Sequence, residues 1–449
     1  MLSLVEAAEQ IRSRKLSAVE LTRVCLARIE RMNPVLNAFI TVTADLALEQ
    51  AVRADAEIMA GNWRGPLHGI PIALKDLIDV AGVRTTAASR QFCNRDATED
   101  AAIVTQLKQA GAVIVGKTNL HEFAFGGSGV VSAFGPAKNP WDVSRITGGS
   151  SSGSAAAVAA GMCIAAIGTD TAGSARVPAA LCGVVGHRPG QGLLSNQGII
   201  PLVESFDTPG PITRSVRDAA TMLDCLAAPG IAKVLESLDE PVTKWKVGVA
   251  RNLSADAEVD VARCFRAAVD FIAQMVSEVT DFDLRWETPP EIRNYEIYRY
   301  HHVMMQNTPE LYDPRTLDRV RDTAGVDEVN YWRAAQSLRE FNQRVRVFDT
   351  LDVVLSPTAL VSAPTIAELD ALDSQALRQY ELRYLLKNTF PFSSLWWPSV
   401  TVPCGFTSEG LPVGLQISAA PGADHVALRL AYAYEQATEW HKRPAPIAS

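Results

Sequence analysis

A lysine at the end of an apolar run is the first residue whose type and position could do chemistry. Lys75 closes the run 69–74, and a lysine at the end of a buried strand is unfavourable unless it is neutral or paired. Burial lowers the pKa of a lysine, which would make Lys75 a usable base near neutral pH. Taken alone, Lys75 is better explained as a surface lysine paired with Asp76 or Asp79.

The Gly/Ser segment 148–154 is the most unusual local feature. An apolar Ala/Val helix follows it at once, so a flexible linker describes it poorly, and we expect Ser154 to cap that helix. Backbone N–H groups at a helix start favour anions, but a phosphate loop ends in Gly-Lys-Ser/Thr and no lysine is present here. Residues 149–153 match the nucleophile elbow G-x-S-x-G with Ser151 as nucleophile, although residues 145–147 make a poor preceding strand.

The loop 168–174 is also rich in small residues, like the Gly/Ser segment 148–154. It follows a buried strand, and the small residues Ala172 and Gly173 let the backbone approach a ligand closely. They can also point successive N–H groups in one direction, which an oxyanion hole requires. Asp170 and Arg176 flank this loop, and we expect them to pair and fix it rather than to bind substrate.

Together these segments resemble the amidase signature family, which are serine amidohydrolases with a Ser–cis-Ser–Lys triad. The resemblance runs from the N-terminal helices to the last helix. The resembling stretches are GIPIALKDLIDVAG, GKTNLHEFAFG, GPAKNPWD, ITGGSSSGSAAAVAAG, IGTDTAGSARVPAALCGVVG, FDTPGPITRSVRDAA and VPCGFTSEGLPVGLQI. The long Gly/Ser signature is highly specific.

The resemblance implies a role for each matching residue. Ser174 would be the acylated nucleophile, Ser150 the bridging serine on a cis peptide bond, and Lys75 the terminal base. The oxyanion hole would be made by the backbone N–H groups of Thr171, Ala172, Gly173 and Ser174. A serine hydroxyl needs a base to take its proton, and neutral Lys75 would accept it through Ser150. This scheme requires no cofactor and no metal ion.

Departures from the family pattern leave the triad intact and put the substrate in doubt. Ala172 replaces a glycine but keeps the N–H donor, so catalysis should survive unless this position needs a positive φ. Four aromatic residues are predicted pocket walls by rough family position, with plain core packing as an equally good explanation. They are Phe125, Trp141, Trp396 and Trp397. The seven histidines share no ligand spacing, and we expect His121 and Glu122 on a helical surface.

The leading functional hypothesis is an amidase that hydrolyses the C–N bond of a linear carboxylic acid amide through an acyl-enzyme on Ser174. One alternative is the amidase (glutaminase) subunit of a tRNA-dependent amidotransferase. Another is a non-catalytic scaffold paralogue, although the intact Lys75, Ser150 and Ser174 speak against it. The expected partner is a small-molecule amide, and the resemblance also implies a homodimer.

Composition narrows the class of protein. The 449 residues carry a net charge of −8, and 47% are hydrophobic, which is ordinary globular composition. The acidic balance argues against direct binding of nucleic acid. Seven cysteines without a C-x-x-C pair indicate reduced thiols and a cytoplasmic protein. The longest weakly polar stretch, 155–168, is too short to cross a membrane.

The elements that must position these residues alternate between strand-like and helical patterns. The first 60 residues predict helices, one of them capped by Ser17 and Glu20. Strand patterns follow at 69–75, 112–116, 163–169, 246–250, 351–357, 399–403 and 413–418. Helices are predicted at 101–110, 154–161, 257–277 and 424–438. This alternation predicts an α/β protein in which one mixed sheet is built from distant segments.

We therefore predict one domain over residues 1–449. The resemblance implies a central mixed sheet of about ten or eleven strands covered by helices on both faces. Within the domain we expect N-terminal helices (1–60), a catalytic core (61–227), a variable middle region (228–350) and a C-terminal completion of the sheet (351–449).

Overall fold

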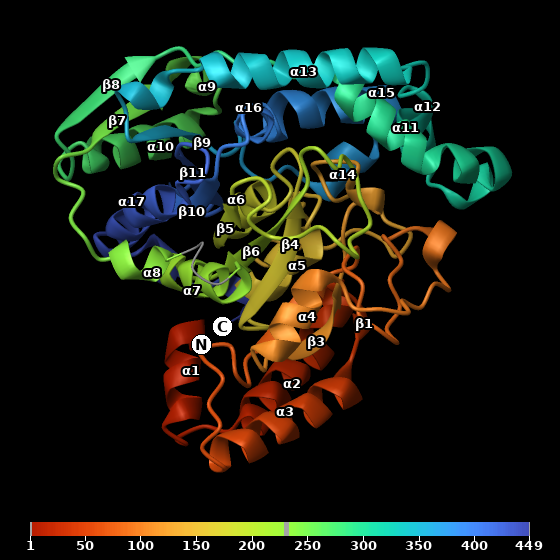
Figure 1. The fold of residues 1–449 in the computed structure, drawn as a ribbon, viewed down its shortest axis with the longest axis vertical. Helices are drawn as coiled ribbons and strands as arrows, with labels where there is room; N and C mark the ends of the chain where they lie inside the picture. The colour runs from red at the N-terminus through yellow and green to blue at the C-terminus, as the bar shows by residue number, and fades with distance from the viewer. Residues whose placement is uncertain (1, 229–232, 449) are drawn as a thin grey trace.

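A mixed sheet organises the computed structural model, which describes residues 2–228 and 233–448 (Figure 1). In these residues the sheet has eleven strands in the order β1-β3-β2-β4-β6-β5-β10-β11-β9-β7-β8. The strands are β1 (Phe39–Val42), β2 (Pro71–Lys75), β3 (Val113–Thr118), β4 (Ala165–Asp170), β5 (Val185–Arg188), β6 (Thr208–Thr213), β7 (Lys246–Ala250), β8 (Glu278–Phe282), β9 (Val353–Pro357), β10 (Ser399–Phe406) and β11 (Pro412–Ser418). The predicted α/β fold with one mixed sheet is confirmed.

Helices surround this sheet. Those before residue 228 are α1 (Leu4–Arg12), α2 (Ala18–Leu36), α3 (Ala44–Met59), α4 (Ala102–Gln109), α5 (Ser152–Ala159), α6 (Arg176–Cys182) and α7 (Val216–Leu226). Those after residue 232 are α8 (Val234–Ser237), α9 (Arg251–Ser254), α10 (Val259–Ile272), α11 (Pro290–Asn307), α12 (Pro314–Arg321), α13 (Glu328–Arg344), α14 (Ile366–Asp370), α15 (Ser374–Tyr380), α16 (Phe390–Ser394) and α17 (Asp424–Gln436). The division of the domain into four parts stays a prediction, and residues 229–232 of its middle part lie outside the described residues.

The central strands are covered on both faces because their side chains alternate between two cores. Ile72 and Leu74 of β2 belong to a large apolar cluster with residues of α4, α7 and α17. Ala73, between them, belongs to a second cluster with residues of α2, α3, α5 and α6. Successive side chains of a strand point to opposite faces, so each cluster fills the space between one face and its helices. The predicted cover of helices on both faces is confirmed.

Strand direction brings the chemical residues to one edge. β2 runs parallel to β4 as its direct neighbour, with Leu74 opposite Ile167. Their carboxyl ends, Lys75 and Asp170, therefore lie at the same edge of the sheet. The segment 171–175 leaves β4 at this edge and leads into α6.

Some of the predicted helix caps and strands agree with the structure, and others do not. Ser17 and Glu20 form the predicted capping box of α2. Ser154 does not cap α5, because that helix begins earlier, after Ser151, and the Ser154 hydroxyl lies 2.6 Å from that of Thr118. Four strands, β1, β5, β6 and β8, were not predicted. β1 is short and sits between two helices, and β6 contains two prolines, which normally argue against an inner strand.

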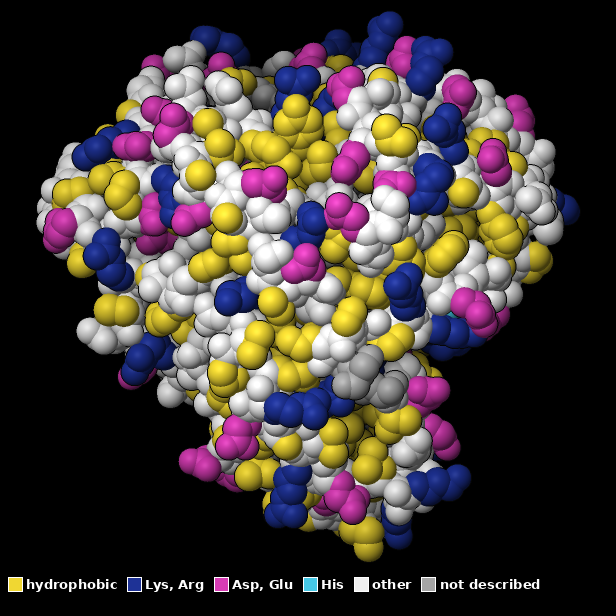
Figure 2. Space-filling view, turned by 180° about the vertical axis from the view of Figure 1, so that it is seen from behind, with side chains coloured by type: hydrophobic (Ala, Val, Ile, Leu, Met, Phe, Trp, Pro, Cys, Tyr) yellow, Lys and Arg dark blue, Asp and Glu magenta, His cyan; other side chains and the backbone are white. Residues whose placement is uncertain are grey.

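The surface is mixed in charge. Figure 2 shows acidic and basic side chains interspersed over the face opposite to the view of Figure 1. The seven cysteines are free thiols, and five of them are buried. In residues 2–228 and 233–448, no helix combines the length and the apolar character needed to cross a membrane.

Candidate active site

Lys75 ends β2 in a completely buried position. Its ammonium Nζ donates one hydrogen bond to Ser150 Oγ at 2.7 Å and another to Thr169 Oγ1 at 2.8 Å. Burial lowers the pKa of Lys75 to about 7, although the negative charges of Asp207 and Asp170 act in the opposite direction. A lysine of this kind is partly neutral at physiological pH and can accept a proton.

The carboxylates next to Lys75 in sequence are engaged elsewhere. Asp76 forms a buried ion pair with Lys117 at 2.8 Å, and Asp79 pairs with Arg95 at 2.6 Å. The explanation of Lys75 as a surface lysine paired with one of these aspartates is therefore wrong. Its buried partners are hydroxyl groups, which can pass a proton on.

Ser150 reaches Lys75 from the turn before α5. The peptide bond between Gly149 and Ser150 is cis. The next residue, Ser151, ties this turn to the neighbouring loop, since its N–H donates to the carbonyl of Ser174 at 3.0 Å. Its hydroxyl donates to the carbonyl of Thr169 on β4 at 3.2 Å. Arg145 and Ile146 each form a single β-bridge in place of a strand, so the elbow motif lacks its required context.

The loop 171–174 carries Ser174, whose exposed fraction is 4%. Gly173 has a φ of +128°, and a Cβ there would lie 2.1 Å from Thr389 Oγ1, so the position requires glycine. Ala172 is not among the described non-glycine residues with positive φ, so alanine is tolerated there. The N–H of Gly173 donates to Asp170 Oδ1 at 2.8 Å. This bond helps to hold the loop, and the predicted place of Gly173 in the oxyanion hole stays a prediction.

Three other backbone donors of this loop stay available. Within the described part of the chain, the N–H groups of Thr171, Ala172 and Ser174 have no acceptor. All three residues line the adjacent pocket. Backbone donors that face a pocket beside a hydroxyl group can stabilise an oxyanion formed there.

A buried ion pair fixes this loop, as expected. Arg176 Nη2 and Nε bind the two carboxylate oxygens of Asp170 at 2.8 and 2.9 Å, and both side chains are fully buried. Burial works against the charged form of Asp170, but Arg176 overrides it and holds the pKa of this carboxyl far below its usual value. Arg176 also donates to the carbonyl of Thr389 and to Gln416, so the pair connects the loop to the C-terminal segments.

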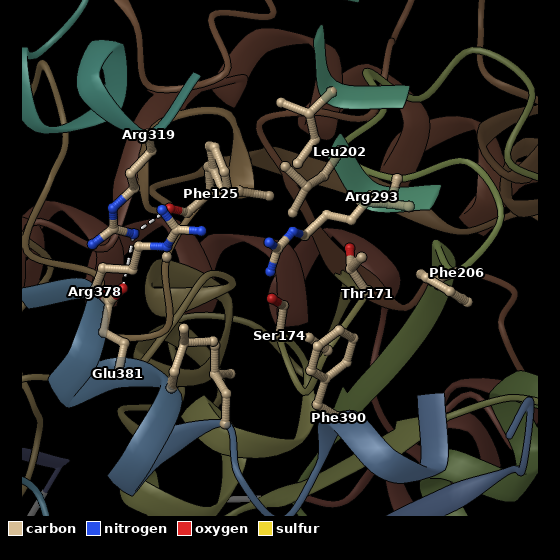
Figure 3. Close-up of a pocket in the computed structure, with 17 residues that line it drawn as sticks. Phe125, Thr171, Ser174, Leu202, Phe206, Arg293, Arg319, Arg378, Glu381 and Phe390 are labelled. Carbon is tan, nitrogen blue, oxygen red and sulfur yellow. Dashed lines mark hydrogen bonds and ion pairs between the residues drawn. The ribbon is translucent and has the colours of Figure 1, made fainter. Parts of the chain in front are cut away.

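The pocket beside Ser174 holds about 650 Å³ of empty space, including solvent at its mouth. Figure 3 shows the Ser174 hydroxyl at its floor, the side chain of Arg293 reaching in from above, and those of Arg319 and Arg378 at the left. The lining residues are Ala124, Phe125, Gly126, Thr171, Ala172, Ser174, Leu202, Val203, Phe206, Arg293, Ile297, Arg319, Arg378, Glu381, Leu382, Leu386 and Phe390.

Of the four aromatic residues predicted for the pocket, Phe125 lines it and the three tryptophans do not. Trp141 packs on Phe406 and donates from Nε1 to the Cys182 carbonyl at 2.8 Å. Trp397 is buried in an apolar cluster. Trp396 packs against a cluster that contains Val203 and Phe206, so it lies behind the pocket wall.

Two residues expected on a helical surface are also buried. His121 and Glu122 lie at the start of a short 3-10 helix (Glu122–Ala124) behind the pocket. The Glu122 carboxylate accepts the N–H of Asp313 at 3.1 Å, and burial raises its pKa to about 7. The sequence between β3 and α5 has no helical periodicity that would have placed these side chains.

Several residues of the site were missed. Asp207 accepts a hydrogen bond from the Thr171 hydroxyl at 2.5 Å and others from the N–H groups of Leu202 and Val203. Burial raises its pKa to about 6. Asp207 lies in the stretch FDTPGPIT, so the motif itself was a usable signal. The pocket arginines had no such signal. In the described residues, no group of His, Cys, Asp and Glu could hold a metal ion.

The large mixed sheet and the pocket at the carboxyl ends of β2 and β4 define the scaffold, and comparison with known proteins specifies its family. A family model described as Amidase matches residues 20–428, so the chain belongs to the amidase signature family. A glutamyl-tRNA(Gln) amidotransferase subunit from Geobacter metallireducens is 37% identical to it, and the alignment covers 99% of each chain.

Solved structures share the whole fold. The native peptide amidase of Stenotrophomonas maltophilia has a TM-score of 0.85 and 30% identity, covering 100% of this chain and 99% of its own. A glutamyl-tRNA(Gln) amidotransferase subunit from Thermotoga maritima has a TM-score of 0.76 and 32% identity, covering 97% of this chain and 94% of its own.

Proposed function

We propose that the chain hydrolyses the C–N bond of a carboxylic acid amide through an acyl-enzyme on Ser174. The observation that carries this proposal is the buried Lys75, whose Nζ lies 2.7 Å from Ser150 Oγ and whose pKa is lowered to about 7. A buried lysine bound to a serine, beside a second serine at the floor of a pocket, supports general-base activation of a hydroxyl nucleophile.

In the first half of the reaction, Ser174 Oγ forms a bond to the amide carbonyl carbon. Its proton passes to Ser150, and the proton of Ser150 passes to neutral Lys75. The carbonyl oxygen becomes an oxyanion, for which the free N–H groups of Thr171, Ala172 and Ser174 are the nearest backbone donors of this loop.

In the second half, the same relay runs in reverse. Lys75 returns its proton through Ser150 to the amide nitrogen, the C–N bond breaks, and ammonia or an amine leaves. Water then attacks the acyl-enzyme, gives its proton to the relay, and releases the carboxylic acid. Ser174 regains its proton at the end, so the cycle balances.

A second proposal concerns the amide that is consumed. The curated relative named above belongs to an amidotransferase, and this favours glutamine as the amide and a protein complex as the setting over a free-standing amidase. The solved peptide amidase, with its TM-score of 0.85, supports the free-standing enzyme. Both proposals use the same Ser174 chemistry.

One experiment tests the shared chemistry, and its extension separates the two settings. Ammonia release is measured over a panel of primary amides, L-glutamine included, together with labelling of Ser174 by a fluorophosphonate probe. We expect turnover and labelling, both absent in Ser174→Ala. Folded protein that neither turns over an amide nor is labelled would instead support a non-catalytic scaffold. Glutamine turnover that rises when the other amidotransferase subunits and tRNA are added would support the role in a complex.

A further inference from the structure

We infer that the pocket takes an amide that also carries a carboxylate and no ammonium group, and that Arg293 and Arg378 bind this carboxylate. The inference rests on the proposed Ser174 chemistry, adds the substrate class to it, and competes with the proposal that glutamine is the amide. Arg293 lies on α11 and Arg378 on α15, and both line the pocket that contains Ser174. Figure 3 shows the Arg293 guanidinium group directly above the Ser174 hydroxyl and the Arg378 guanidinium group farther to the left, beside Arg319.

The pocket has an excess of positive charge. Among the described residues that line it there are three arginines and one carboxylate, Glu381. That carboxylate is already saturated, because it binds Arg319 at 2.8 Å, the hydroxyl of Ser128 at 2.5 Å and the N–H of Ser128 at 3.0 Å. Glu381 therefore neutralises Arg319 and leaves the other two arginines without a counter-charge inside the pocket.

The partners of these two arginines do not supply one. Arg293 donates to the neutral side chain of Asn294. Arg378 binds Asp322, whose side chain is 63% exposed and does not line the pocket. Burial, together with the charge of Arg378, lowers the pKa of Arg293, as expected for like charges that face each other.

Arg319 is occupied by Glu381 and is not available to a ligand. It is 3% exposed, and its Nε and Nη2 atoms, which have no hydrogen-bond partner within the described residues, are buried away from the pocket space. The acceptor oxygens of a ligand would therefore meet Arg293 and Arg378. A carboxylate accepts two parallel bonds from a guanidinium group, and such charge-assisted bonds are among the strongest in proteins.

The remaining walls exclude a cationic group. They are apolar, and they include Leu202, Phe206, Ile297 and Phe390. An ammonium group in this space would meet two guanidinium groups and no available carboxylate. A half-amide of a dicarboxylic acid fits these constraints, whereas an amino acid amide such as glutamine places a positive charge in a cationic pocket.

Three substrates of equal length isolate the two charges. Glutaramate differs from L-glutamine only by the missing ammonium group, and from valeramide only by its carboxylate. For the wild-type enzyme we expect kcat/KM for glutaramate to exceed both others at least about tenfold, and Arg293→Gln or Arg378→Gln to lower it about 10- to 100-fold. The same variants should change kcat/KM for valeramide less than about threefold.

Arg299→Gln is the matched control, because Arg299 lies on the same helix, is 60% exposed and pairs with Glu204 outside the pocket. It should leave the preference for glutaramate unchanged. Equal or better turnover of valeramide or L-glutamine by the wild-type enzyme would overturn the inference while the Ser174 chemistry stands. Loss of the preference for glutaramate in Arg299→Gln, as strong as in the pocket variants, would also overturn the inference.

A binding measurement separates failure of the inference from failure of the proposed function. Calorimetry with folded Ser174→Ala should detect glutaramate at a concentration at which valeramide does not bind, and adding Arg293→Gln should weaken glutaramate binding at least about tenfold. Binding of this kind without turnover by the wild-type enzyme would contradict the hydrolytic function and still support the carboxylate site. Absence of glutaramate binding to the folded variant would refute the carboxylate site.

Discussion

The floor and the roof of the pocket are built on different principles. The floor consists of strand ends and tight loops, in which Lys75, Ser150 and Ser174 are buried and held by hydrogen bonds to neighbouring segments. The roof consists of helices from residues 290–390, most of which lie at the top of Figure 1, and three of their arginine side chains line the pocket.

This difference suggests a division of roles: the floor residues would carry out the reaction, and the roof residues would select the substrate. The side chains of Lys75 and Ser150 have their partners within the floor, so their geometry depends little on the rest of the molecule. The roof contributes three arginine side chains to the pocket lining, and two of them lack a counter-charge in the pocket. We therefore expect floor substitutions to remove activity or folding, and roof substitutions to change which amide is accepted.

The largest effect should come from the nucleophile. Ser174→Ala removes the atom that forms the acyl-enzyme, so kcat should fall at least about a thousandfold. Ser151→Ala is the matched control, because its hydroxyl serves the carbonyl of Thr169 rather than the pocket. It should keep kcat within about tenfold and cost about 1 kcal/mol of stability. If Ser151→Ala were inactive and Ser174→Ala active, Ser151 would be the nucleophile, as the G-x-S-x-G elbow motif predicts.

Lys75→Met should lower kcat about 10²- to 10⁴-fold, as expected for loss of a general base. In the wild-type enzyme, kcat should rise with pH through about 7, because only neutral Lys75 accepts a proton. Parallel assays from about pH 5.5 to 9 check both points. A pH-independent wild-type rate across this range would contradict the role of Lys75.

Stability provides a separate test of the same residue. Folding lowers the pKa of Lys75 from 10.5 to about 7, so between these values the unfolded chain binds more protons than the folded one. Wild-type stability should therefore rise with pH through this window relative to Lys75→Met, and the difference should be constant below it. Melting temperatures at about pH 7 and pH 9 measure this. An equal pH response in both proteins would show that Lys75 keeps its ordinary pKa.

The same contrast explains what the sequence could predict. Lys75, Ser150 and Ser174 stand in long motifs of strand ends and loops, where the spacing along the chain determines the local geometry, and the structure brings the first two into hydrogen-bond contact. Most strands near them were also predicted, because their apolar runs are short and continuous. Asp207 and the inner strand β6 were not predicted, nor was the direction of the Gly173 N–H, since it depends on Asp170 across the loop.

The roof could not be predicted in the same way. Arg293 and Arg378 lie on helices whose polar faces look like ordinary solvent-exposed surface in the sequence, and only the packing of those helices turns them toward Ser174. Aromatic residues were ambiguous for a related reason. Trp141 and Phe125 carry the same apolar signal, but one packs against Phe406 and the other lines the pocket.

Arg176→Met tests how firmly the floor is fixed. It removes both side-chain hydrogen bonds of Arg176 to the Asp170 carboxylate and leaves only Arg188 as a cationic partner, whose Nη1 lies 3.6 Å from Asp170 Oδ1, so it should cost about 3–5 kcal/mol of stability. The double variant Asp170→Asn with Arg176→Met removes both charges and should recover part of this loss. Chemical denaturation followed by fluorescence compares them. Single and double variants of equal stability would show that the pair does not hold the loop through its charges.

The smallest effect should come from Asp207, which connects floor and roof. Its carboxylate binds the Thr171 hydroxyl on one side and the N–H groups of Leu202 and Val203 on the other, and its charge raises the pKa of Lys75. Asp207→Asn keeps an acceptor oxygen but removes the charge. The rise of kcat should therefore move to lower pH by roughly half a unit to one unit.

Glu204→Gln is the control for this shift, because Glu204 is 60% exposed and pairs with Arg299. Its pH profile should coincide with that of the wild-type enzyme, since solvent screens its charge. A shift of Asp207→Asn to higher pH would mean that a group other than Lys75 controls the rate. If the rise of kcat moves to lower pH as expected while substrate preference stays the same, Asp207 adjusts the pKa of Lys75 without selecting the substrate. Asp207 then belongs with the residues that carry out the reaction, and the residues that select the substrate lie in the roof.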